Sequence, residues 1–462
     1  MLYFREKEIE KLNVFFSTPR KKAMAIYGRR RTGKTKLVTD YIAGLETKDI
    51  VYYQVASFDY TVALGDFKNA LKTMLSDNPL IDAFVSFKDI FAYLSETKST
   101  ALIKGIIIDE FPFLAKKNLD IVTEFQWIID HGLGSTKLIL LGSNRSFMKK
   151  QISDTESPLY GRFDEIIEIM PFSFENIQTL FPKLEDAVDV YAQTGGVAQY
   201  VMMFREYPSV KEATAALFFD NNGRLFREAE NLLLQELRDI TTYTSVLRAL
   251  GGASKEAGQL AKKVGIDARG VFTYLAKLVD LGIVETLENA LPAKGKGEKR
   301  YRIADMLFRF NFTFIAPNVS MITAIGSAAV DYVLGSKYNE YLGFVYEEII
   351  ASRCFKYALE GGLPFMPTNI GKWWGNVKEN GDWHESEIDL IAFDDHNVVL
   401  GECKYKNKQI GFGELDNLRL KAAFIPVKDR KIYFLLASKS GFTNEIINLR
   451  ESLDNLVLID GV

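Results

Sequence analysis

Cysteine and histidine are both scarce in this sequence. Among its 462 residues there are only two cysteines, Cys354 and Cys403, and three histidines. So few cysteines exclude a disulfide framework and a cysteine-built zinc site, and they suit a reducing compartment. Three histidines leave little room for a metal centre of imidazole ligands. We therefore expect a cytoplasmic protein without a disulfide framework.

Long apolar runs and a strong charge of one sign are also missing. The N-terminus shows no apolar signal region, and we find no run long enough to span a membrane, so no membrane partner is expected. The net charge of −3 gives no global basic field, so a nucleic-acid partner would have to be recognised by a local patch. A length of 462 residues favours roughly two to four domains.

The clearest motif present is the stretch Gly28-Arg29-Arg30-Arg31-Thr32-Gly33-Lys34-Thr35. A short apolar run precedes it and a helical pattern follows, which is the strand–loop–helix setting of a P-loop. Gly28 and Gly33 allow backbone N–H groups to curl around phosphate oxygens, and the helix N-terminus adds positive charge. Lys34 is expected to reach the β- and γ-phosphates of ATP, and Thr35 to hold Mg²⁺. The alternative is a basic turn that fits the pattern by chance.

A second motif, residues 105–112, reads Gly-Ile-Ile-Ile-Asp-Glu-Phe-Pro. Three aliphatic residues that end in Asp-Glu, at this distance after a P-loop, form a Walker B pattern. Burial of the strand would place Asp109 at the carboxyl end of the sheet, near the Mg²⁺ on Thr35. Glu110 would then orient or polarise the attacking water. The alternative is a strand followed by a helix cap.

Two later positions are weaker candidates. An apolar run, 137–141, ends in Gly142-Ser143-Asn144, where a small polar residue is placed to sense the γ-phosphate. Ser143 is the first choice and Asn144 the second, against a simple turn. Arg162 could neutralise charge that develops on the γ-phosphate, in cis or from a neighbouring subunit of a homo-oligomer. A surface or ion-paired arginine is the alternative.

These motifs, in this order, resemble the archaeal-type ATPases, a branch of the AAA+/STAND P-loop class. The resemblance covers about residues 1–230, and the triple arginine makes it more specific than a bare P-loop. It implies an αβα core with a parallel sheet and a helical lid. It assigns hydrolysis to Asp109 and Glu110, with Arg162 at the family's Gly-Arg position. The residues expected to bind the nucleotide are Gly28, Arg31, Thr32, Gly33, Lys34, Thr35, Asp109 and Ser143.

The middle of the chain changes to short helices followed by a basic hairpin. Helices are expected at 244–250, 257–264 and 268–281, with Gly265 ending the second and Asp267 capping the third. Two short strands, 283–287 and 299–303, would pair around a Lys/Gly loop, which predicts a winged helix-turn-helix. Its expected partner-facing cations are Arg269, Lys277, Lys296 and Lys299.

The charge of this middle part favours DNA contact, although winged helices also serve as protein-contact modules. Between Ser254 and Arg302 there are ten Lys/Arg and six Asp/Glu, an excess of four positive charges. An excess of this size suits phosphate contacts along a duplex but is modest for a DNA-binding domain.

The C-terminal part contains two adjacent strands that carry acidic residues. A strand with Glu387 and Asp389 is followed, after a tight turn, by a strand that ends Glu402-Cys403-Lys404. Strand alternation places Glu387 with Asp389 and Glu402 with Lys404, while the apolar residues between them face a core. A hairpin would bring Asp389 beside Glu402, and two carboxylates there repel unless a divalent cation bridges them.

This acidic pair followed by lysine resembles the PD-(D/E)xK nuclease superfamily. The stretch from about 310 to 462 also resembles the C-terminal domain attached to archaeal-type ATPases, through Gly371-Lys372-Trp373-Trp374-Gly375 among other matches. The resemblance implies that Asp389 and Glu402 hold a metal ion, that Lys404 holds water or stabilises charge, and that Glu347 completes the cluster. A degenerate nuclease fold with a charged edge is the alternative.

The predicted architecture is thus an α/β multidomain protein. It consists of a P-loop αβα ATPase core at 1–175, a helical lid at 176–240, a winged helix-turn-helix at 241–308 and a restriction-endonuclease-like α/β domain at 309–462. ATP and Mg²⁺ are the expected cofactors, and DNA is the expected partner. The predicted function is an ATP-regulated, metal-dependent nuclease. The alternatives are a regulatory ATPase whose C-terminal domain only binds nucleic acid or protein, and a restriction-like defence effector.

Overall fold

The computed structural model describes residues 3–45, 49–75, 80–96, 103–115, 118–292, 299–379 and 381–461. The chain divides into two compact units. Unit 1 consists of residues 1–172 and 197–200, and unit 2 of residues 173–196 and 201–462. The parts that the sequence treats as lid, middle and C-terminal modules therefore belong, almost entirely, to a single compact unit.

Unit 1 is built on a parallel sheet of five strands in the order β2-β3-β4-β1-β5. The strands are β1 (Ala23–Tyr27), β2 (Ile50–Gln54), β3 (Gly105–Asp109), β4 (Lys137–Gly142) and β5 (Glu165–Glu168). Because β4 lies between β3 and β1, the carboxyl ends of these three strands meet at one edge. Asp109, at the end of β3, the P-loop, after β1, and Ser143, after β4, therefore all lie at that edge.

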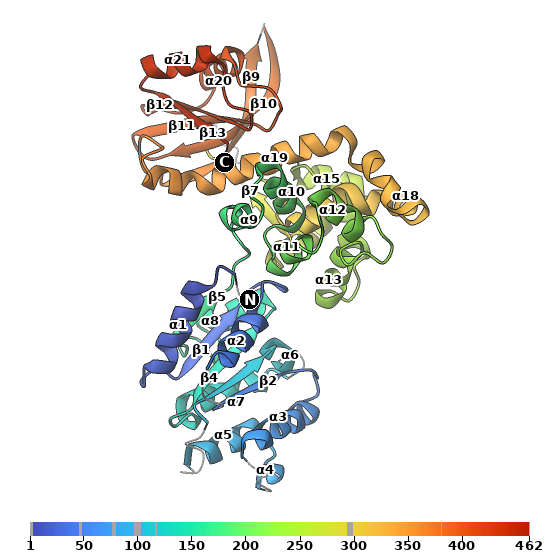
Figure 1. The fold of residues 1–462 in the computed structure, drawn as a ribbon, viewed down its shortest axis with the longest axis vertical. Coiled ribbons are helices and arrows are strands. Elements are labelled where there is room, and N and C mark those ends of the chain that lie inside the picture. Colours follow the sequence, from blue (N-terminus) through green and yellow to red (C-terminus); the bar gives the residue numbers. More distant parts are fainter. Residues whose placement is uncertain are drawn as a thin grey trace. The chain divides into compact units, whose positions relative to one another are not determined.

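Helices cover both faces of this sheet, as Figure 1 shows in the blue and cyan part of the chain. On one face, α1 (Glu6–Ser17) and α2 (Lys34–Ala43) share an apolar core with β1. On the other face the core includes α3 (Tyr60–Leu75), α5 (Phe87–Glu96) and α7 (Asp120–Trp127). Burial from both sides explains why β1, β3 and β4 are fully buried. The predicted αβα core is confirmed.

Among the described residues, unit 1 also contains several short helical segments. They are α4 (Leu80–Ala83), α6 (Phe111–Ala115), the π-helical turn η2 (Ile128–Gly132) and α8 (Arg145–Ser153).

Unit 2 begins with the helices predicted for the lid. They are α9 (Phe174–Leu180), α10 (Leu184–Thr194), α11 (Ala198–Phe204), α12 (Val210–Phe218) and α13 (Glu228–Glu236). The first residues of α11 belong to unit 1, so the chain passes between the units on either side of Val197–Tyr200. The helix α10 ends at Gly195, which takes a left-handed backbone conformation with φ of 58°.

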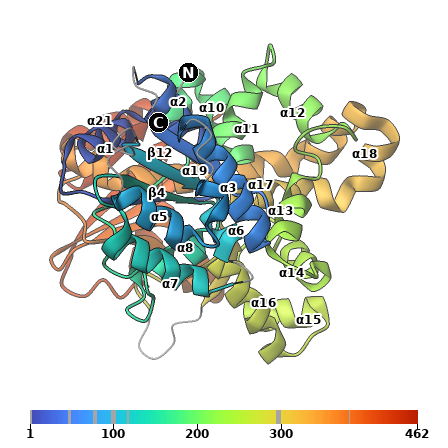
Figure 2. The same ribbon diagram turned by 90° about the horizontal axis from the view of Figure 1, so that it is seen from below.

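The middle part has three helices and a small antiparallel sheet in the order β6-β8-β7. Its elements are α14 (Thr241–Leu250), β6 (Lys255–Glu256), α15 (Ala257–Val264), α16 (Ala268–Asp280), β7 (Val284–Leu287) and β8 (Arg300–Ile303). The three helices lie together in Figure 2. Both predicted caps are present, because Gly265 is left-handed at the end of α15 and the Asp267 carboxylate accepts a hydrogen bond from the Gly270 N–H at 2.6 Å.

A continuous helical run connects the middle part to the C-terminal sheet. It comprises α17 (Met306–Phe310), η3 (Asn311–Ile315), η4 (Ala316–Asn318), α18 (Val319–Ile325), η5 (Gly326–Ala329) and α19 (Val330–Leu359). The backbone leaves the helical region at Gly326 and at Gly335.

By length and composition alone, the helical run Met306–Leu359 could cross a membrane. Its most apolar window has a mean hydropathy of 1.4, and 33% of that window is buried. The expectation that no run of this kind exists is therefore wrong. The run is difficult to recognise in the sequence because Arg309, Pro317, Gly326 and Gly335 interrupt the apolar residues. In the structure its helical elements follow one another directly along the chain.

The C-terminal part is a mixed five-stranded sheet in the order β13-β12-β11-β10-β9. Its strands are β9 (Asn369–Glu379), β10 (Asp382–Phe393), β11 (Asn397–Lys404), β12 (Lys431–Ser438) and β13 (Leu456–Asp460). The pairs β9–β10 and β10–β11 are antiparallel, whereas β11–β12 and β12–β13 are parallel. One apolar core contains residues of α20 (Phe412–Ala422) and α21 (Asn444–Ser452), and the other contains residues of α19.

The middle part is joined directly to this sheet. Asn289, just after β7, forms a bridge with Lys372 of β9, and the Asn289 side-chain amide donates to the Trp374 carbonyl at 2.6 Å. Leu291 is 7% exposed and belongs to the core that lies under β10 and β11. The first residues after β7, Asn289 to Leu291, therefore pack with the C-terminal sheet.

Candidate functional site

The P-loop adopts a tight conformation that requires its glycines. At Gly28, φ is +154°, and a Cβ atom there would lie 2.4 Å from the Ile169 carbonyl oxygen. Gly33 has φ of +95° and forms the N-cap of α2. Arg31 is also left-handed, with φ of 68°. A side chain at Gly28 would collide with the backbone beyond β5, so this position accepts only glycine.

Lys34 is buried and its ammonium group is held by the loop. Its Nζ donates to the carbonyl oxygens of Gly28 at 2.9 Å and Arg29 at 2.8 Å. Burial lowers the pKa of Lys34 to about 8, although the charges of Glu110 and Asp109 oppose this shift. Thr32, also buried, donates from its hydroxyl to the Arg29 carbonyl at 2.8 Å. The loop thus presents a desolvated cation where phosphate oxygens are expected to bind.

The Walker B aspartate lies against the P-loop threonine. The Thr35 hydroxyl donates to Asp109 Oδ2 at 2.6 Å, and the Tyr52 hydroxyl donates to the same oxygen at 2.8 Å. Burial, followed by the charge of Asp109, raises the pKa of Tyr52, so it stays a donor. Sequence reasoning missed Tyr52, because an aromatic residue in a buried strand looks like core. Its sequence position gives no signal of this role.

Glu110, at the end of β3, is held by contacts of its backbone and of its side chain. Its backbone is left-handed, with φ of 58°, and its N–H donates to Asp109 Oδ1 at 2.8 Å. The Ser143 hydroxyl lies 2.7 Å from both Glu110 carboxylate oxygens, and Arg30 lies 3.9 Å away. A left-handed backbone costs free energy in a residue other than glycine and is common at functional sites. Ser143 therefore orients Glu110 in this structure.

The other two candidates in unit 1 take structural partners. Asn144 caps α8, since its side-chain oxygen accepts a hydrogen bond from the Phe147 N–H at 2.9 Å. The Arg162 Nε donates to both carboxylate oxygens of Asp130 at 3.0 Å. The structure thus shows the ion-paired arginine that the sequence left open as the alternative for Arg162.

Arg31 connects the P-loop to the short segment 197–200 of the same unit. Its carbonyl accepts a hydrogen bond from the Gln199 N–H at 3.1 Å, and its guanidinium donates to Gln199 Oε1 at 3.4 Å. The guanidinium also lies over the Tyr200 ring, 5.7 Å from its centroid. The residues that lead into α11 are therefore held by the same loop that carries Lys34.

The pKa of Lys34 predicts how ATP binding depends on pH. Phosphate charge stabilises the ammonium, so the pKa of Lys34 is expected to rise when ATP binds, and binding takes up a proton above about pH 8. Affinity should be level below that pH and fall by up to about tenfold per pH unit above it. Calorimetric titration with ATP at pH 7 and pH 9, in buffers of different ionisation enthalpy, measures the proton uptake. Equal proton uptake at both pH values would contradict the assignment of Lys34.

The second candidate site lies on β10 and β11. Their register pairs Leu390 with Gly401 and, continued by one residue, places Asp389 opposite Glu402. The Cys403 N–H donates to Asp389 Oδ2 at 2.9 Å. Asp389, Glu402 and Glu347 of α19 are all buried. The carboxylates that the sequence singled out are thus brought to adjacent strands and one neighbouring helix.

The predicted alternation along β10 is wrong at one point. The register with β9 shifts between Ile388 and Ile391, and this bulge breaks the period of two. As a result Ile388 belongs to the core that also contains Ile391, whereas Leu390 belongs to the opposite core. Glu387 is exposed while Asp389 is buried, so the two do not share an environment.

Lysines pair with the carboxylates of this acidic cluster. Lys404 pairs with Glu402, and Lys372 of β9 pairs with Glu347. Lys421 of α20 approaches Glu402 to 3.6 Å and donates to the Glu387 carbonyl at 3.0 Å. Sequence reasoning missed Lys372 and Lys421 as members of the cluster. Both lie far from the acidic motif in the sequence, and only the Lys-Trp-Trp motif drew attention to the first.

The carboxylates perturb one another. Burial, followed by the charges of Glu347 and Glu402, raises the pKa of Asp389 to about 8. Burial also raises the pKa of Glu347, against the opposing charge of Lys372. The pKa of Lys404 is raised, because Glu402 and Asp389 outweigh its burial. Shifts of this kind are typical of functional sites, although buried ion-pair networks also produce them.

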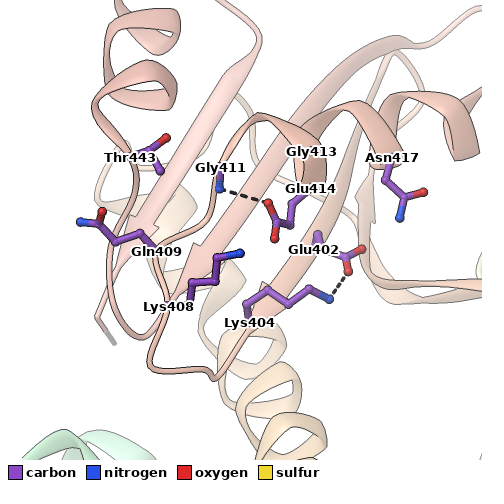
Figure 3. Close-up of a pocket in the computed structure, with 9 residues that line it drawn as sticks. All are labelled: Glu402, Lys404, Lys408, Gln409, Gly411, Gly413, Glu414, Asn417 and Thr443. Carbon is purple, nitrogen blue, oxygen red and sulfur yellow. Dashed lines mark hydrogen bonds and ion pairs between the residues drawn. The ribbon is translucent and has the colours of Figure 1, made fainter.

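In the described part of the chain, no three His, Cys, Asp or Glu side chains converge as a ready-made metal site. Beside Glu402 and Lys404, however, lies an open cavity of about 620 Å³ (Figure 3). Lys408, Gln409, Asn417 and Thr443 line it, together with the backbone near the start of α20. Of the acidic cluster, Glu402 lines this cavity, whose other charged groups are Lys404, Lys408 and Glu414.

The predicted cations of the middle part are only partly available. Arg269 is exposed on α16, Lys277 pairs with Asp280 at 2.9 Å, and Lys299 pairs with Glu288 at 2.8 Å. Lys296 lies outside the described residues. Phe272, half exposed on the same helix, adds an apolar group to that surface.

Comparisons with known proteins agree with the nucleotide site. A family model for an ATPase domain predominantly from archaea matches residues 2–204. A second model, for archaeal and bacterial proteins of unknown function, matches residues 311–415. The uncharacterized protein MJECL04 of Methanocaldococcus jannaschii is 30% identical over 419 residues, which are 88% of each chain.

Two solved structures resemble the fold. The Walker-type ATPase PABY2304 of Pyrococcus abyssi has a TM-score of 0.50 and 16% identity, over 67% of this chain and 96% of that chain. A weaker likeness is the ORC2 protein of Aeropyrum pernix in its ADPNP-ADP complexes, with a TM-score of 0.45 and 15% identity, over 70% of this chain and 95% of that one.

The fold, the P-loop and the matched model together define the class: the protein is a P-loop ATPase whose residues 2–204 match an ATPase domain found predominantly in archaea. The chain belongs to the family that includes the Methanocaldococcus relative, which it matches over nearly its whole length.

Proposed function

We propose that this ATPase regulates a metal-dependent nuclease site in its C-terminal sheet. The observation that carries the proposal is the pairing of β10 with β11, in which Leu390 lies opposite Gly401 and the Cys403 N–H donates to Asp389 Oδ2 at 2.9 Å. Asp389 thus lies next to the Glu402-Cys403-Lys404 segment of β11. Burial of these carboxylates is costly unless positive charge or a cation compensates them. Glu402 and Lys404 line an open cavity together with Lys408 and Glu414, and a carboxylate pair with a lysine of this kind suits phosphodiester hydrolysis.

In the ATP site, each residue has a role that its position supports. Lys34 would bind the β- and γ-phosphates, and the Thr35 hydroxyl and Asp109 carboxylate, both oxygen donors, fit Mg²⁺. Bound there, Mg²⁺ would neutralise charge on the phosphates. Glu110, held by Ser143, would orient the attacking water. Arg162 would contribute in cis or from a neighbouring subunit only after its ion pair with Asp130 opens.

In the C-terminal site, Asp389 and Glu402 are the expected ligands of a divalent cation, and Glu347 is a further carboxylate whose charge acts on Asp389. The oxygen donors fit Mg²⁺ or Mn²⁺. A bound cation would supply a Lewis acid at the scissile phosphate. Lys404 would stabilise negative charge on that phosphate or hold the water, while Lys408 and Gln409 offer contacts to the flanking backbone.

A second candidate is a regulatory ATPase whose C-terminal sheet only binds nucleic acid or protein. The specific observation in its favour is that Lys372, Lys404 and Lys421 already balance Glu347 and Glu402. A site neutralised by its own lysines does not depend on a cation for stability. The two candidates differ in whether a metal ion displaces these pairs.

The partner class follows from the same features. We propose nucleic acid, probed first as DNA, with the exposed face of α16 around Arg269 as one contact besides the cavity. We also propose that the protein acts in the cytoplasm. If Arg162 acts in trans, the protein must in addition form a homo-oligomer.

A cleavage assay tests the proposed nuclease. The wild-type protein is incubated with linear, circular and single-stranded DNA and with RNA, in Mg²⁺ or Mn²⁺, with and without ATP. Cleavage should require the metal and fall at least about 100-fold in Asp389→Asn, because a charged oxygen ligand is lost. Asp416→Asn, an exposed carboxylate of α20, is the matched control and should cleave normally. Nucleic-acid binding without any metal-dependent cleavage would favour the second candidate.

A further inference from the structure

Glu348, the residue next to Glu347, is clamped by two arginines from the neighbouring part of the chain. The Glu348 Oε1 atom lies 2.5 Å from Arg302 of β8 and 2.6 Å from Arg309 of α17. Arg302 also pairs with Glu285 of β7 at 2.5 Å, and Arg309 donates from Nε to the Ile303 carbonyl at 2.6 Å. Burial opposes ionisation of Glu348, but Arg309 and Arg302 outweigh it and lower the pKa of Glu348.

This clamp fixes α19 at the turn that carries Glu347. Successive residues of a helix share one rigid backbone, so a carboxylate anchored at Glu348 restricts where the Glu347 side chain begins. The arginines are suited to this role because a guanidinium forms several hydrogen bonds in a fixed geometry. Arg302 uses this property to contact Glu285 and Glu348 at once.

The ion-pair partner of Glu347 is fixed from the same direction. Lys372, which pairs with Glu347, lies on β9 where the segment after β7 is attached. The Ala290 N–H donates to the Lys372 carbonyl at 2.8 Å. The Asn289 side-chain amide donates to the Trp374 carbonyl, also on β9, at 2.6 Å. Both members of the Glu347–Lys372 pair are therefore held by contacts with residues of the β7–β8 hairpin or its connection.

We propose that the hairpin formed by β7 and β8 is a positioning element of the C-terminal acidic site, with Arg302 as its central residue. This inference rests on the proposed metal site and adds the residues outside the C-terminal sheet that set its geometry. Arg302 acts through Glu348 on Glu347, and Asn289 acts through β9 on Lys372. A ligand that binds the middle part would then act on the acidic cluster through this hairpin.

The alternative is that these contacts only stabilise the fold. A stabilising pair alone would change the denaturation midpoint but not the affinity of the folded protein for a metal ion. A positioning role changes metal affinity, because partners outside the ligand shell typically alter it about 10- to 100-fold when removed. If the role is positioning, a substitution that keeps the positive charge should also restore part of the metal affinity. These two readouts separate positioning from stability.

The experiment is a titration of the nucleotide-free full-length protein with Mn²⁺, followed by electron paramagnetic resonance. The Mn²⁺ binding that is lost in Asp389→Asn belongs to the C-terminal site. Arg302→Gln should lower the Mn²⁺ affinity of that site about tenfold or more, and Arg302→Lys should lower it less. Arg224→Gln, which removes an exposed ion pair with Glu206 in the same unit, is the control and should bind normally.

A second variant guards against misfolding of the first. Asn289→Ala removes one hydrogen bond to β9 and leaves Glu348 clamped, and it should weaken Mn²⁺ binding in the same direction. Wild-type affinity in both Arg302→Gln and Asn289→Ala would overturn the positioning role. If the wild type binds no Mn²⁺ that Asp389→Asn removes, the metal site itself fails, and with it the proposed nuclease.

Discussion

Replacing Glu110 with glutamine is expected to slow ATP hydrolysis about 100- to 1,000-fold while ATP affinity changes little. Glutamine keeps the size and shape of the side chain, so the contact with the Ser143 hydroxyl can persist. What is lost is the negative charge that polarises the attacking water. The lysine that is expected to hold the phosphates donates to the Gly28 and Arg29 carbonyls and is influenced by Glu110 through its charge, so ATP affinity should change far less than in Lys34→Ala.

Nucleotide titration and phosphate release together measure this separation. Lys34→Ala is the complementary variant, because it deletes the buried cation and should lose most of the ATP affinity. Arg145→Gln, which removes an exposed ion pair with Glu168 beyond the site, is a matched control with normal turnover. Near-normal turnover in Glu110→Gln would show that another group activates the water. Unchanged ATP affinity in Lys34→Ala would contradict the P-loop assignment.

The nucleotide half of the protein could be predicted closely because its signals are local. Glycines at fixed positions, an apolar strand before them and Asp-Glu after a second strand each determine the backbone nearby. The contact of Ser143 with Glu110 was not predictable, and the expected role of this serine toward the γ-phosphate stays a prediction. Asn144 illustrates the same limit: its amide caps α8, which sequence reasoning did not consider.

The acidic site shows where strand alternation succeeds and where it fails. On β11 the period of two places Glu402 and Lys404 together, and their ion pair agrees with that. On β10 a bulge after Ile388 breaks the period, and nothing in the local sequence marks it. Lys372 and Lys421 join the site through pairings across the sheet and with α20. Such long-range pairings depend on register and helix packing, which a single sequence does not specify.

The connection after β7 was the least predictable part of the fold. Its sequence, Glu288-Asn289-Ala290-Leu291-Pro292, resembles an ordinary loop of a free hairpin. In the structure it pairs with β9, and Leu291 joins a core made otherwise of C-terminal residues. One leucine in a polar stretch carries no periodicity, so its burial arises only from the tertiary contact. This is why the middle and C-terminal parts were expected to be independent.

Replacing Leu291 with aspartate is therefore expected to destabilise the C-terminal sheet strongly. The change removes a buried apolar side chain and places an unpaired carboxylate in the core, which should cost at least about 3 kcal/mol of unfolding free energy. Three of the four tryptophans, Trp373, Trp374 and Trp383, lie on β9 and β10, so their fluorescence reports on this sheet. Urea denaturation followed by that fluorescence measures the loss.

The matched control is Leu420→Asp, the same substitution on α20 at a side chain that is 56% exposed. It should change the free energy of unfolding by less than about 0.5 kcal/mol, as is usual for surface positions. If the middle part were an independent domain, the two variants would behave alike. A large loss in Leu291→Asp alone would instead show that the β7–β8 connection and the C-terminal sheet fold as one cooperative body, which is the physical condition under which Arg302 can set the position of Glu347.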